Sequence, residues 1–439
     1  MNNKRIIKNI GVSMIMKPIS MLLSLAYTPL ALAFLGEEKY GIWAIILNII
    51  SWINYFDIGI GNGLRNKLTE SITNNDKETA QNYVSTAYFG TTIISLCFCV
   101  VITLIWNVFN LSDFFNLTPP DENANLIIFI SVFFVCINFV LSLSKTAAYS
   151  IQQPGIISVV GVIGQVLQIG TILVISRIYE QNLFVVAIMY GIVSLFDNII
   201  IYIIVTKNRF FLKPKISLVN KVYLKLLLRL GTGFFVMQIC SLVLNTTDNL
   251  LISNLYGSAE VTPYNIVYKV FYMVVQVHAI IIMPMWSAYT EAATRKDMEW
   301  IKKTMRRINL ITVIFSVGVL IGIFLFEPMA AIWLHKELEY GRWLIIIVAI
   351  YMIAQMVGGN YSSFLCGVGD IRISTIIAAI EAIINIPLSI FFAKYCNMKL
   401  AGIILGSLVV MMVSVVVLPI VSYKWINKHN IEWGKDHND

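Results

Sequence analysis

Apolar stretches of about 20 residues recur along the whole of this chain, and each is long enough to cross the ~30 Å hydrocarbon core of a bilayer as an α-helix. Because hydrocarbon offers the backbone no hydrogen-bond partner, each stretch must satisfy its own peptide groups, which a helix does within one segment. Hydrophobic residues make up 58% of the sequence and charged residues only 13%, which is unlike the composition of soluble domains. The predicted fold class is therefore an all-α integral membrane protein.

The apolar runs predict about twelve transmembrane helices. They cover residues 9–34, 41–62, 83–106, 124–146, 156–178, 183–205, 228–255, 262–286, 308–330, 342–364, 373–393 and 400–423. The first run follows basic residues and imitates a signal peptide. It is too long for that role and is interrupted by Lys17 and Pro18, so we interpret it as a retained helix.

The placement of charge predicts the orientation independently of hydropathy, because Lys and Arg accumulate in short cytoplasmic loops. With the N-terminus in the cytoplasm, most of the 32 basic residues fall on that side, above all in segments 207–229 and 295–307. The outer loops then hold only Lys39, Arg177, Lys336, Arg342, Lys394 and Lys399. We predict that both termini are cytoplasmic. The net charge of +8 then reflects orientation and contact with anionic lipid, and no nucleic-acid partner is expected.

The chain resembles itself at an offset of 221 residues. The matched pairs are Gly36 with Gly257, Thr69-Glu70 with Thr290-Glu291, Thr73 with Thr294, Asp76 with Asp297 and Glu78 with Glu299. In both halves these residues lie at equivalent positions relative to the apolar runs, which indicates an ancient duplication. Since both halves begin on the inside and hold six helices, the repeat is parallel, as in one class of transporters.

The repeat predicts four segments. Residues 1–206 form an N-terminal six-helix lobe, 207–227 a basic cytoplasmic linker, 228–423 a C-terminal six-helix lobe and 424–439 a cytoplasmic tail. The linker is interpreted as a connector that obeys the positive-inside rule. An amphipathic segment on the membrane surface is the alternative.

Polar side chains form stripes inside several spans. Ser13, Lys17, Ser20 and Ser24 step by three or four residues, which places them on one face of the first helix. Costly intramembrane polar groups tend to face an interior cavity. The residues expected to face a water-filled cavity and bind substrate are Lys17, Lys269, Lys145, Ser24, Asn48, Tyr55, Gln238, Asn245, Tyr272 and Gln276. For the uncharged members, hydrogen bonds from helix to helix are the alternative.

Four carboxylates lie in or beside spans and are candidates for ion coupling. They are Asp248, Glu381, Asp57 and Asp197. Burial of an isolated carboxylate shifts its proton affinity, which is what coupling to a proton gradient requires. Asp57 has the alternative of bonding only nearby backbone or Arg65.

Motifs for other chemistry are missing from the sequence. The glycines Gly59, Gly61 and Gly63 have the spacing of part of a dinucleotide fingerprint, but no strand precedes them. The sequence has no P-loop and no HExxH motif, and its six cysteines lack metal-ligand spacing. We expect no cofactor, no metal and no enzymatic activity.

Several short motifs resemble those of a known family. The turn Leu35-Gly-Glu-Glu-Lys-Tyr-Gly-Ile-Trp43 and the stretch Asp57-Ile-Gly-Ile-Gly-Asn-Gly-Leu-Arg65 resemble the N-terminal signature of polysaccharide flippases of the O-antigen transporter type. Thr247-Asp-Asn249 through Tyr256-Gly257 and Tyr264-Asn265 through Lys269 are similar to that family's seventh and eighth helices. These flippases belong to the multidrug, oligosaccharidyl-lipid and polysaccharide exporter superfamily.

The resemblance implies a fold and a function. The implied fold is two pseudo-symmetric six-helix bundles forming a V in a bacterial cytoplasmic (inner) membrane. The implied activity is alternating access that moves an undecaprenyl-diphosphate-linked oligosaccharide, such as an O-antigen or capsule repeat unit, to the outer leaflet. Lys17 and Lys269 would take the role of the family's cationic headgroup residues. Beside the lipid-linked substrate and membrane lipids, the implied partners are a polysaccharide polymerase and a chain-length regulator.

Two other functions remain open. The first is a cation-coupled multidrug exporter of the same superfamily, against which the basic Lys17 on the first polar face argues. The second is a membrane-embedded polysaccharide polymerase or ligase. Such enzymes typically need a large outer loop, and the longest one predicted here covers only 107–123.

Overall fold

The computed structural model describes residues 3–53, 59–108, 124–257, 260–334 and 341–435, and all regular structure in these ranges is helical. The elements of the first part of the chain are α1 (Asn3–Ile53), α2 (Ile60–Thr73), α3 (Lys77–Val108), α5 (Ala124–Leu141), α6 (Leu143–Ser150), α7 (Pro154–Ile175) and α8 (Leu183–Thr206). They are followed by the short η1 (Phe210–Leu212) and η2 (Ile216–Leu218), and then by α9 (Lys221–Tyr256), α10 (Val261–Thr294), α11 (Met298–Leu334), α12 (Arg342–Val368), α13 (Arg372–Ile390), η4 (Phe391–Tyr395) and α14 (Lys399–Lys435).

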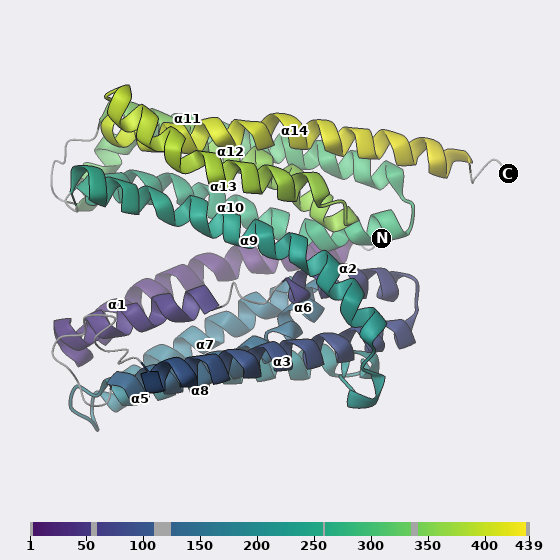
Figure 1. Cartoon of the computed structure of the whole chain (residues 1–439), viewed down its shortest axis with the longest axis horizontal. Coiled ribbons are helices and arrows are strands. Elements are labelled where there is room, and N and C mark those ends of the chain that lie inside the picture. Colours follow the sequence, from purple (N-terminus) through teal and green to yellow (C-terminus); the bar gives the residue numbers. More distant parts are fainter. Residues whose placement is uncertain (1–2, 54–58, 109–123, 258–259, 335–340, 436–439) are drawn as a thin grey trace. The chain divides into compact units, whose positions relative to one another are not determined.

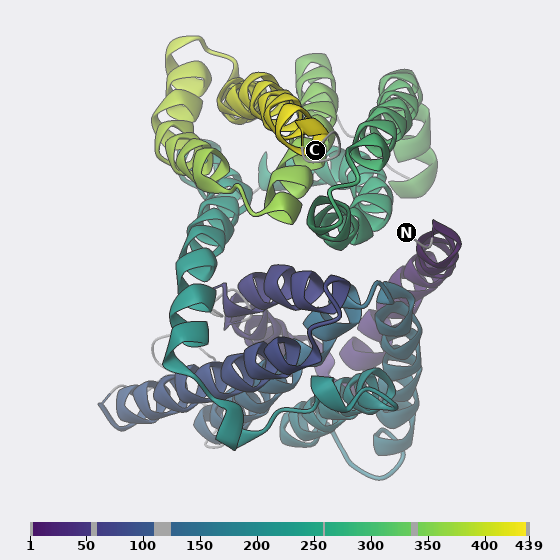
Figure 2. The same cartoon turned by 90° about the vertical axis from the view of Figure 1, so that its right-hand side faces the viewer.

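These helices form two compact units, Met1–Phe235 and Val236–Asp439. Within each unit the helices run roughly alongside one another, seen from the side in Figure 1 and nearer to end-on in Figure 2. The division falls inside α9, whose residues up to Phe235 pack with the first unit.

Eleven helices of the described residues are long and apolar enough to cross a membrane. They correspond to the predicted spans, except that the second prediction, 41–62, includes residues 54–58, outside the described part. The helices extend beyond the predicted edges: α3 begins at Lys77 and α9 at Lys221. Hydropathy marks only the stretch in hydrocarbon, whereas helical hydrogen bonding continues into the polar flanks.

One predicted span end agrees with the structure, and one predicted helix is interrupted. Although α1 continues through Ile53, it consists of two helices that meet at Gly36, whose φ of 74° lies outside the helical region, so the first span ends close to the predicted residue 34. The fourth predicted helix is divided into α5 and α6 at Ser142. The Ser142 hydroxyl donates to the Phe139 carbonyl at 2.7 Å, and such side-chain bonding to the backbone competes with the helical pattern.

The internal repeat is confirmed in local geometry. Gly36 and Gly257 both have a positive φ. Asp76 accepts from the Thr79 backbone N–H at 3.0 Å, and Asp297 accepts from Trp300 at the same distance, so each carboxylate caps the helix that follows. Hydrogen bonds from the side chain and backbone of Thr79 hold the pKa of Asp76 below its usual value.

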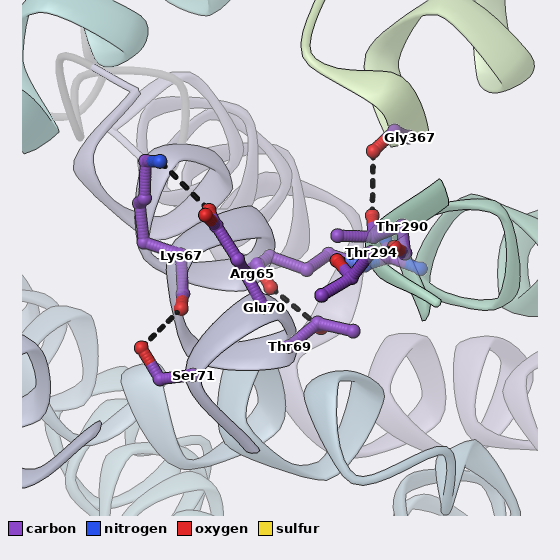
Figure 3. A network of polar contacts seen from close by, with 8 residues as sticks. All are labelled: Arg65, Lys67, Thr69, Glu70, Ser71, Thr290, Thr294 and Gly367. Carbon is purple, nitrogen blue, oxygen red and sulfur yellow. Dashed lines mark hydrogen bonds and ion pairs between the residues drawn. The ribbon is translucent and has the colours of Figure 1, made fainter. Parts of the chain in front are cut away.

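The same pair of threonines sits before each capped turn. Thr73 donates to the Thr69 carbonyl and Thr294 to the Thr290 carbonyl, both at 2.8 Å. Figure 3 shows Thr69 on α2 and both Thr290 and Thr294 on α10, and Thr290 also donates to the Gly367 carbonyl on α12 at 2.7 Å. The two halves therefore form the same hydrogen bonds before equivalent turns.

Apolar side chains in each unit divide between an interior and an outer surface. In the second unit Phe271, Phe326 and Val348 belong to one continuous buried cluster. Large side chains such as Phe324 and Ile383 are more than 70% exposed on spanning helices. In water such exposure would be costly, but lipid tails are as apolar as these side chains.

Gly59 should be the least replaceable glycine of the first unit. Its φ is 71°, and a Cβ there would meet the backbone carbonyl of Gly231 on α9. We expect Gly59→Ala to destabilise the protein by about 2 kcal/mol. The alanine would have to adopt a left-handed backbone conformation, and its Cβ would overpack the contact with the Gly231 backbone. Thermal unfolding in detergent measures this. Gly161→Ala is the matched control, because a Cβ at Gly161 meets nothing within 4 Å. Equal stability of the two variants would contradict the assigned contact.

Candidate functional site

The two lysines predicted to bind substrate lie within spanning helices and are exposed. Lys17 is on α1, one turn beyond Ser13, whose hydroxyl is buried against α7 and accepts a hydrogen bond from Ser158 at 3.0 Å. Lys269 lies on α10. No ion pair of the described residues includes either lysine.

The second unit contains a cavity of about 410 Å³, a size typical of ligand pockets. Helices α9, α10, α12, α13 and α14 all contribute to its wall. Three residues predicted from sequence line it, namely Tyr272, Gln276 and Glu381. Lys269, Tyr272 and Gln276 follow one another at helical spacing on α10, so Lys269 continues the cavity-lining stripe by one turn.

Other cavity residues were missed by the sequence reasoning. They are Tyr351, Gln355, Ser362, Ser374 and Ser414, together with the apolar lining of Met237, Leu244, Val275, Ala279, Gly358, Gly359, Ala378, Met411 and Leu418. Ser241, on the polar face that the sequence gives α9, also lines the cavity. A signal existed on α12, where Tyr351, Gln355 and Ser362 recur on one face. It was weak because isolated serines are common in spanning helices.

The first unit contains a smaller cavity, of about 150 Å³. Polar residues at helical spacing meet there, namely Asn138, Ser142 and Lys145 along α5 and α6 and Tyr190 and Ser194 on α8. The lining residues are Trp43, Ser131, Phe134, Val135, Asn138, Ser142, Lys145, Ala187, Tyr190, Gly191, Ser194 and Asn198. The amide of Asn198 donates to the side-chain oxygen of Asn138 at 2.6 Å, joining α8 to α5. Lys145 thus lines a polar pocket of the first unit.

Asp197 lies behind this pocket and is half-buried. Its charge interacts with that of Lys145. One of its carboxylate oxygens is buried with no hydrogen-bond partner among the described residues. The carboxylate packs against Gly164 of α7, where a Cβ would collide with it. The first unit therefore holds one basic and one acidic group close to the same cavity.

Asp248 is buried in the second unit, with 5% of its surface exposed. The Tyr264 hydroxyl donates to it at 2.7 Å, and the Ser407 hydroxyl lies 3.2 Å from its other oxygen. The amide of Asn385 donates to Ser407 at 2.7 Å. Helices α9, α10, α13 and α14 thus meet at a carboxylate held by hydroxyl groups.

A row of tyrosines on α10 links this carboxylate to the cavity of the second unit. Tyr264 bonds Asp248, Tyr268 stacks on Tyr264 with ring centres 5.9 Å apart, and Tyr272 stacks on Tyr268 at 5.5 Å. Tyr272 lines the cavity. The stacked rings therefore run along α10 from the tyrosine that bonds Asp248 to one that lines the cavity of the second unit.

The remaining predicted residues are placed as follows. Ser24 is exposed on α1, and its carbonyl accepts from Thr28 at 3.4 Å. Gln238 is half-buried on α9, and its side-chain oxygen has no hydrogen-bond partner among the described residues. Tyr55, Asp57 and the side chains of Asn48 and Asn245 lie outside the described residues.

Comparison with known proteins decides the family. Residues 6–290 match the family described as "Polysaccharide biosynthesis protein". The chain belongs to that family. Residues 234–391 of this polysaccharide biosynthesis protein also match the MatE family, which confirms the predicted membership of the exporter superfamily.

Relatives of this polysaccharide biosynthesis protein extend over nearly its whole length. A Salmonella typhimurium protein named for O-antigen transport is 23% identical over 409 residues, 91% of this chain and 92% of its own. A Yersinia pseudotuberculosis protein named for O-antigen export is 21% identical and covers 88% of both chains.

Solved structures show the same fold at low sequence identity. A MOP superfamily transporter from Pyrococcus furiosus gives a TM-score of 0.79 at 16% identity and covers 97% of this chain and 96% of its own. A MATE structure in a bent conformation gives 0.81 at 16% identity and covers 98% and 96%. The predicted fold class, a helical exporter of this superfamily, is confirmed.

Proposed function

We propose that this multi-pass membrane protein is a polysaccharide flippase that moves an undecaprenyl-diphosphate-linked oligosaccharide from the inner to the outer leaflet by alternating access. Its family membership supports a part in polysaccharide biosynthesis. Its relatives named for O-antigen transport and export support a role in carrying a glycan out of the cytoplasm.

The observation that carries this proposal is the pair of exposed lysines within spanning helices, neither of which forms an ion pair with another described residue. A diphosphate that enters a low-dielectric cleft needs cationic hydrogen-bond donors, and these are strongest when the donor is charged. Lys17 and Lys269 stand on polar stripes of different units and are free of ion pairs among the described residues. Lys145, in the cavity of the first unit, would be a third cation on the substrate's path.

The protein lies in the bacterial inner membrane with both termini in the cytoplasm, beside a polysaccharide polymerase and a chain-length regulator that use its product. Movement is driven by an ion gradient, with Asp248 as the first candidate for the coupling group and Glu381, Asp197 and Asp57 as the others.

One observation favours the multidrug exporter as a second candidate. The cavity of the second unit contains an acidic group, Glu381, beside Tyr272 and Tyr351, and this combination suits a lipophilic cation. It does not account for Lys17 and Lys269. The polymerase alternative has no comparable support among the described residues.

Reconstitution tests the three functions together. The purified chain is placed in liposomes that hold fluorescently labelled undecaprenyl-diphosphate-linked oligosaccharide in the inner leaflet, and appearance of the glycan outside is followed with a lectin. We expect transfer at least about tenfold faster than in empty liposomes. Extrusion of ethidium without glycan transfer would favour the drug exporter, and growth of the glycan chain would favour the polymerase.

A further inference from the structure

The cavity of the second unit differs in charge from the lysine positions. Its wall contains one acidic group, Glu381, and no Lys or Arg among the described lining residues. A diphosphate would meet no cation in this wall, and an ionised Glu381 would repel it in a setting where Coulomb interactions are weakly screened. The cavity is therefore unsuited to the charged anchor of the proposed substrate.

About half of the residues that line the cavity carry a hydroxyl, phenol, amide or carboxyl group. Glu381 is only 4% exposed, and its Oε1 accepts from the backbone N–H of Ser414 at 3.2 Å. Ser374 is 3% exposed, and its hydroxyl has no hydrogen-bond partner among the described residues. Buried polar groups are normally satisfied, so an unpartnered hydroxyl in a cavity wall points to a ligand that completes it.

Aromatic and thioether groups share the wall with these polar groups. Tyr272 and Tyr351 offer ring faces, and Met237 and Met411 offer soft apolar surface. The amide of Gln355 donates to the Tyr351 hydroxyl at 3.0 Å, which holds one ring in place. A sugar ring has apolar C–H faces and a rim of hydroxyl groups, and both match this mixture.

We propose that this cavity is a glycan subsite, which holds a sugar residue of the lipid-linked oligosaccharide while the diphosphate binds at the lysines. Glu381 accepts a hydrogen bond from a hydroxyl or amide N–H of that sugar, and Ser374 bonds a second polar group. This inference rests on the proposed flippase function. It adds that the two parts of the substrate bind at different places: the diphosphate anchor at the lysines and the glycan in this cavity.

Gly359 of α12 allows the cavity to be filled without disturbing the helices. It lines the cavity, and a Cβ added there meets nothing within 4 Å. Gly318 of α11 is equally open and exposed, but it is not part of this wall. Gly359→Leu and Gly318→Leu are thus a matched pair that differ in whether the new side chain enters the cavity.

The test measures binding of two lipids to the full-length protein in nanodiscs. The probes are undecaprenyl diphosphate alone and the undecaprenyl-diphosphate-linked oligosaccharide extracted from cells that lack this chain. We expect Gly359→Leu to weaken binding of the glycan-bearing lipid by about tenfold and to leave binding of undecaprenyl diphosphate unchanged, whereas Gly318→Leu changes neither. Glu381→Gln, which keeps the shape and removes the charge, should weaken only the glycan-bearing lipid, by about threefold to tenfold.

The outcomes separate the subsite from the flippase function. If the unaltered protein binds neither lipid, the proposed function fails. Suppose instead that the unaltered protein binds both lipids, and that Gly359→Leu and Glu381→Gln weaken binding of neither lipid or weaken binding of the two lipids equally. In that case the glycan subsite is wrong while the flippase proposal stands. Saturable binding of tetraphenylphosphonium that Glu381→Gln abolishes, with glycan-lipid binding intact, would assign the cavity to lipophilic cations and also overturn the inference.

Discussion

Replacing both Lys17 and Lys269 with alanine should reduce transfer of the lipid-linked oligosaccharide by about 100-fold or more. Each lysine is proposed to donate a charge-assisted hydrogen bond to the diphosphate, and such a bond contributes about 1.5–3 kcal/mol. Two lost bonds therefore amount to about 3 kcal/mol or more, and each 1.4 kcal/mol is a factor of ten. Surface-polysaccharide output and liposome transfer both measure the loss.

The matched control for this pair is Lys213→Ala. Lys213 is exposed between η1 and η2, so the substitution removes a positive charge outside the spanning helices. It should leave transfer within about twofold of the unaltered protein, because exposed charges are strongly screened. The single variants should each lose roughly tenfold, and Lys17→Arg and Lys269→Arg should retain part of the activity, since arginine keeps the charge but has a different donor geometry. Full output from the double alanine variant at native expression would refute the role of the lysines.

Asp248→Asn should abolish the dependence of transfer on a pH gradient and slow the gradient-driven rate by about tenfold. A carboxylate buried without a neighbouring cation is costly in its charged form, so it can gain or lose a proton as its surroundings change. The amide cannot exchange that proton. It has nearly the same shape and can still accept from the Tyr264 hydroxyl, so the fold should survive. Transfer is compared in liposomes with and without an imposed gradient.

Tyr264→Phe provides a graded control for the aspartate. It removes the 2.7 Å hydrogen bond but leaves the carboxylate in place, so gradient dependence should persist with a shifted pH profile. A purely structural role for Asp248 would instead lower the stability of both variants and leave the gradient dependence of the remaining activity unchanged. If transfer by Asp248→Asn depends on the pH gradient as in the unaltered protein, Asp248 is not the coupling group. If transfer by the unaltered protein is unchanged when the pH gradient is collapsed, transport is not coupled to protons.

Local patterns in the sequence predicted those parts of the protein that depend on neighbouring residues. Helix number followed from runs of apolar residues, because each helix satisfies its backbone internally. The repeat predicted paired turns, and Asp76 and Asp297 cap equivalent helices. Lys145 lines one cavity together with Asn138 and Ser142, because residues three and four apart share a helix face.

The division of polar residues between structural and ligand-facing positions could not be read from those patterns. Asp248 and Glu381 look alike in sequence, as isolated acids in apolar helices. In the fold Asp248 is held by hydroxyls from α10 and α14, whereas Glu381 lines the cavity of the second unit. Ser374 and Ser414, which no sequence signal singled out, lie in the same wall.

Sequence alone thus determined that this chain is a duplicated bundle of membrane helices with costly polar stripes, since hydropathy, spacing and charge act along the chain. Only the tertiary structure decided which polar groups bond one another and which remain open to a ligand. The physical reason is that a hydroxyl or carboxylate in a helix has the same local pattern in either case, and its partners come from helices distant in sequence.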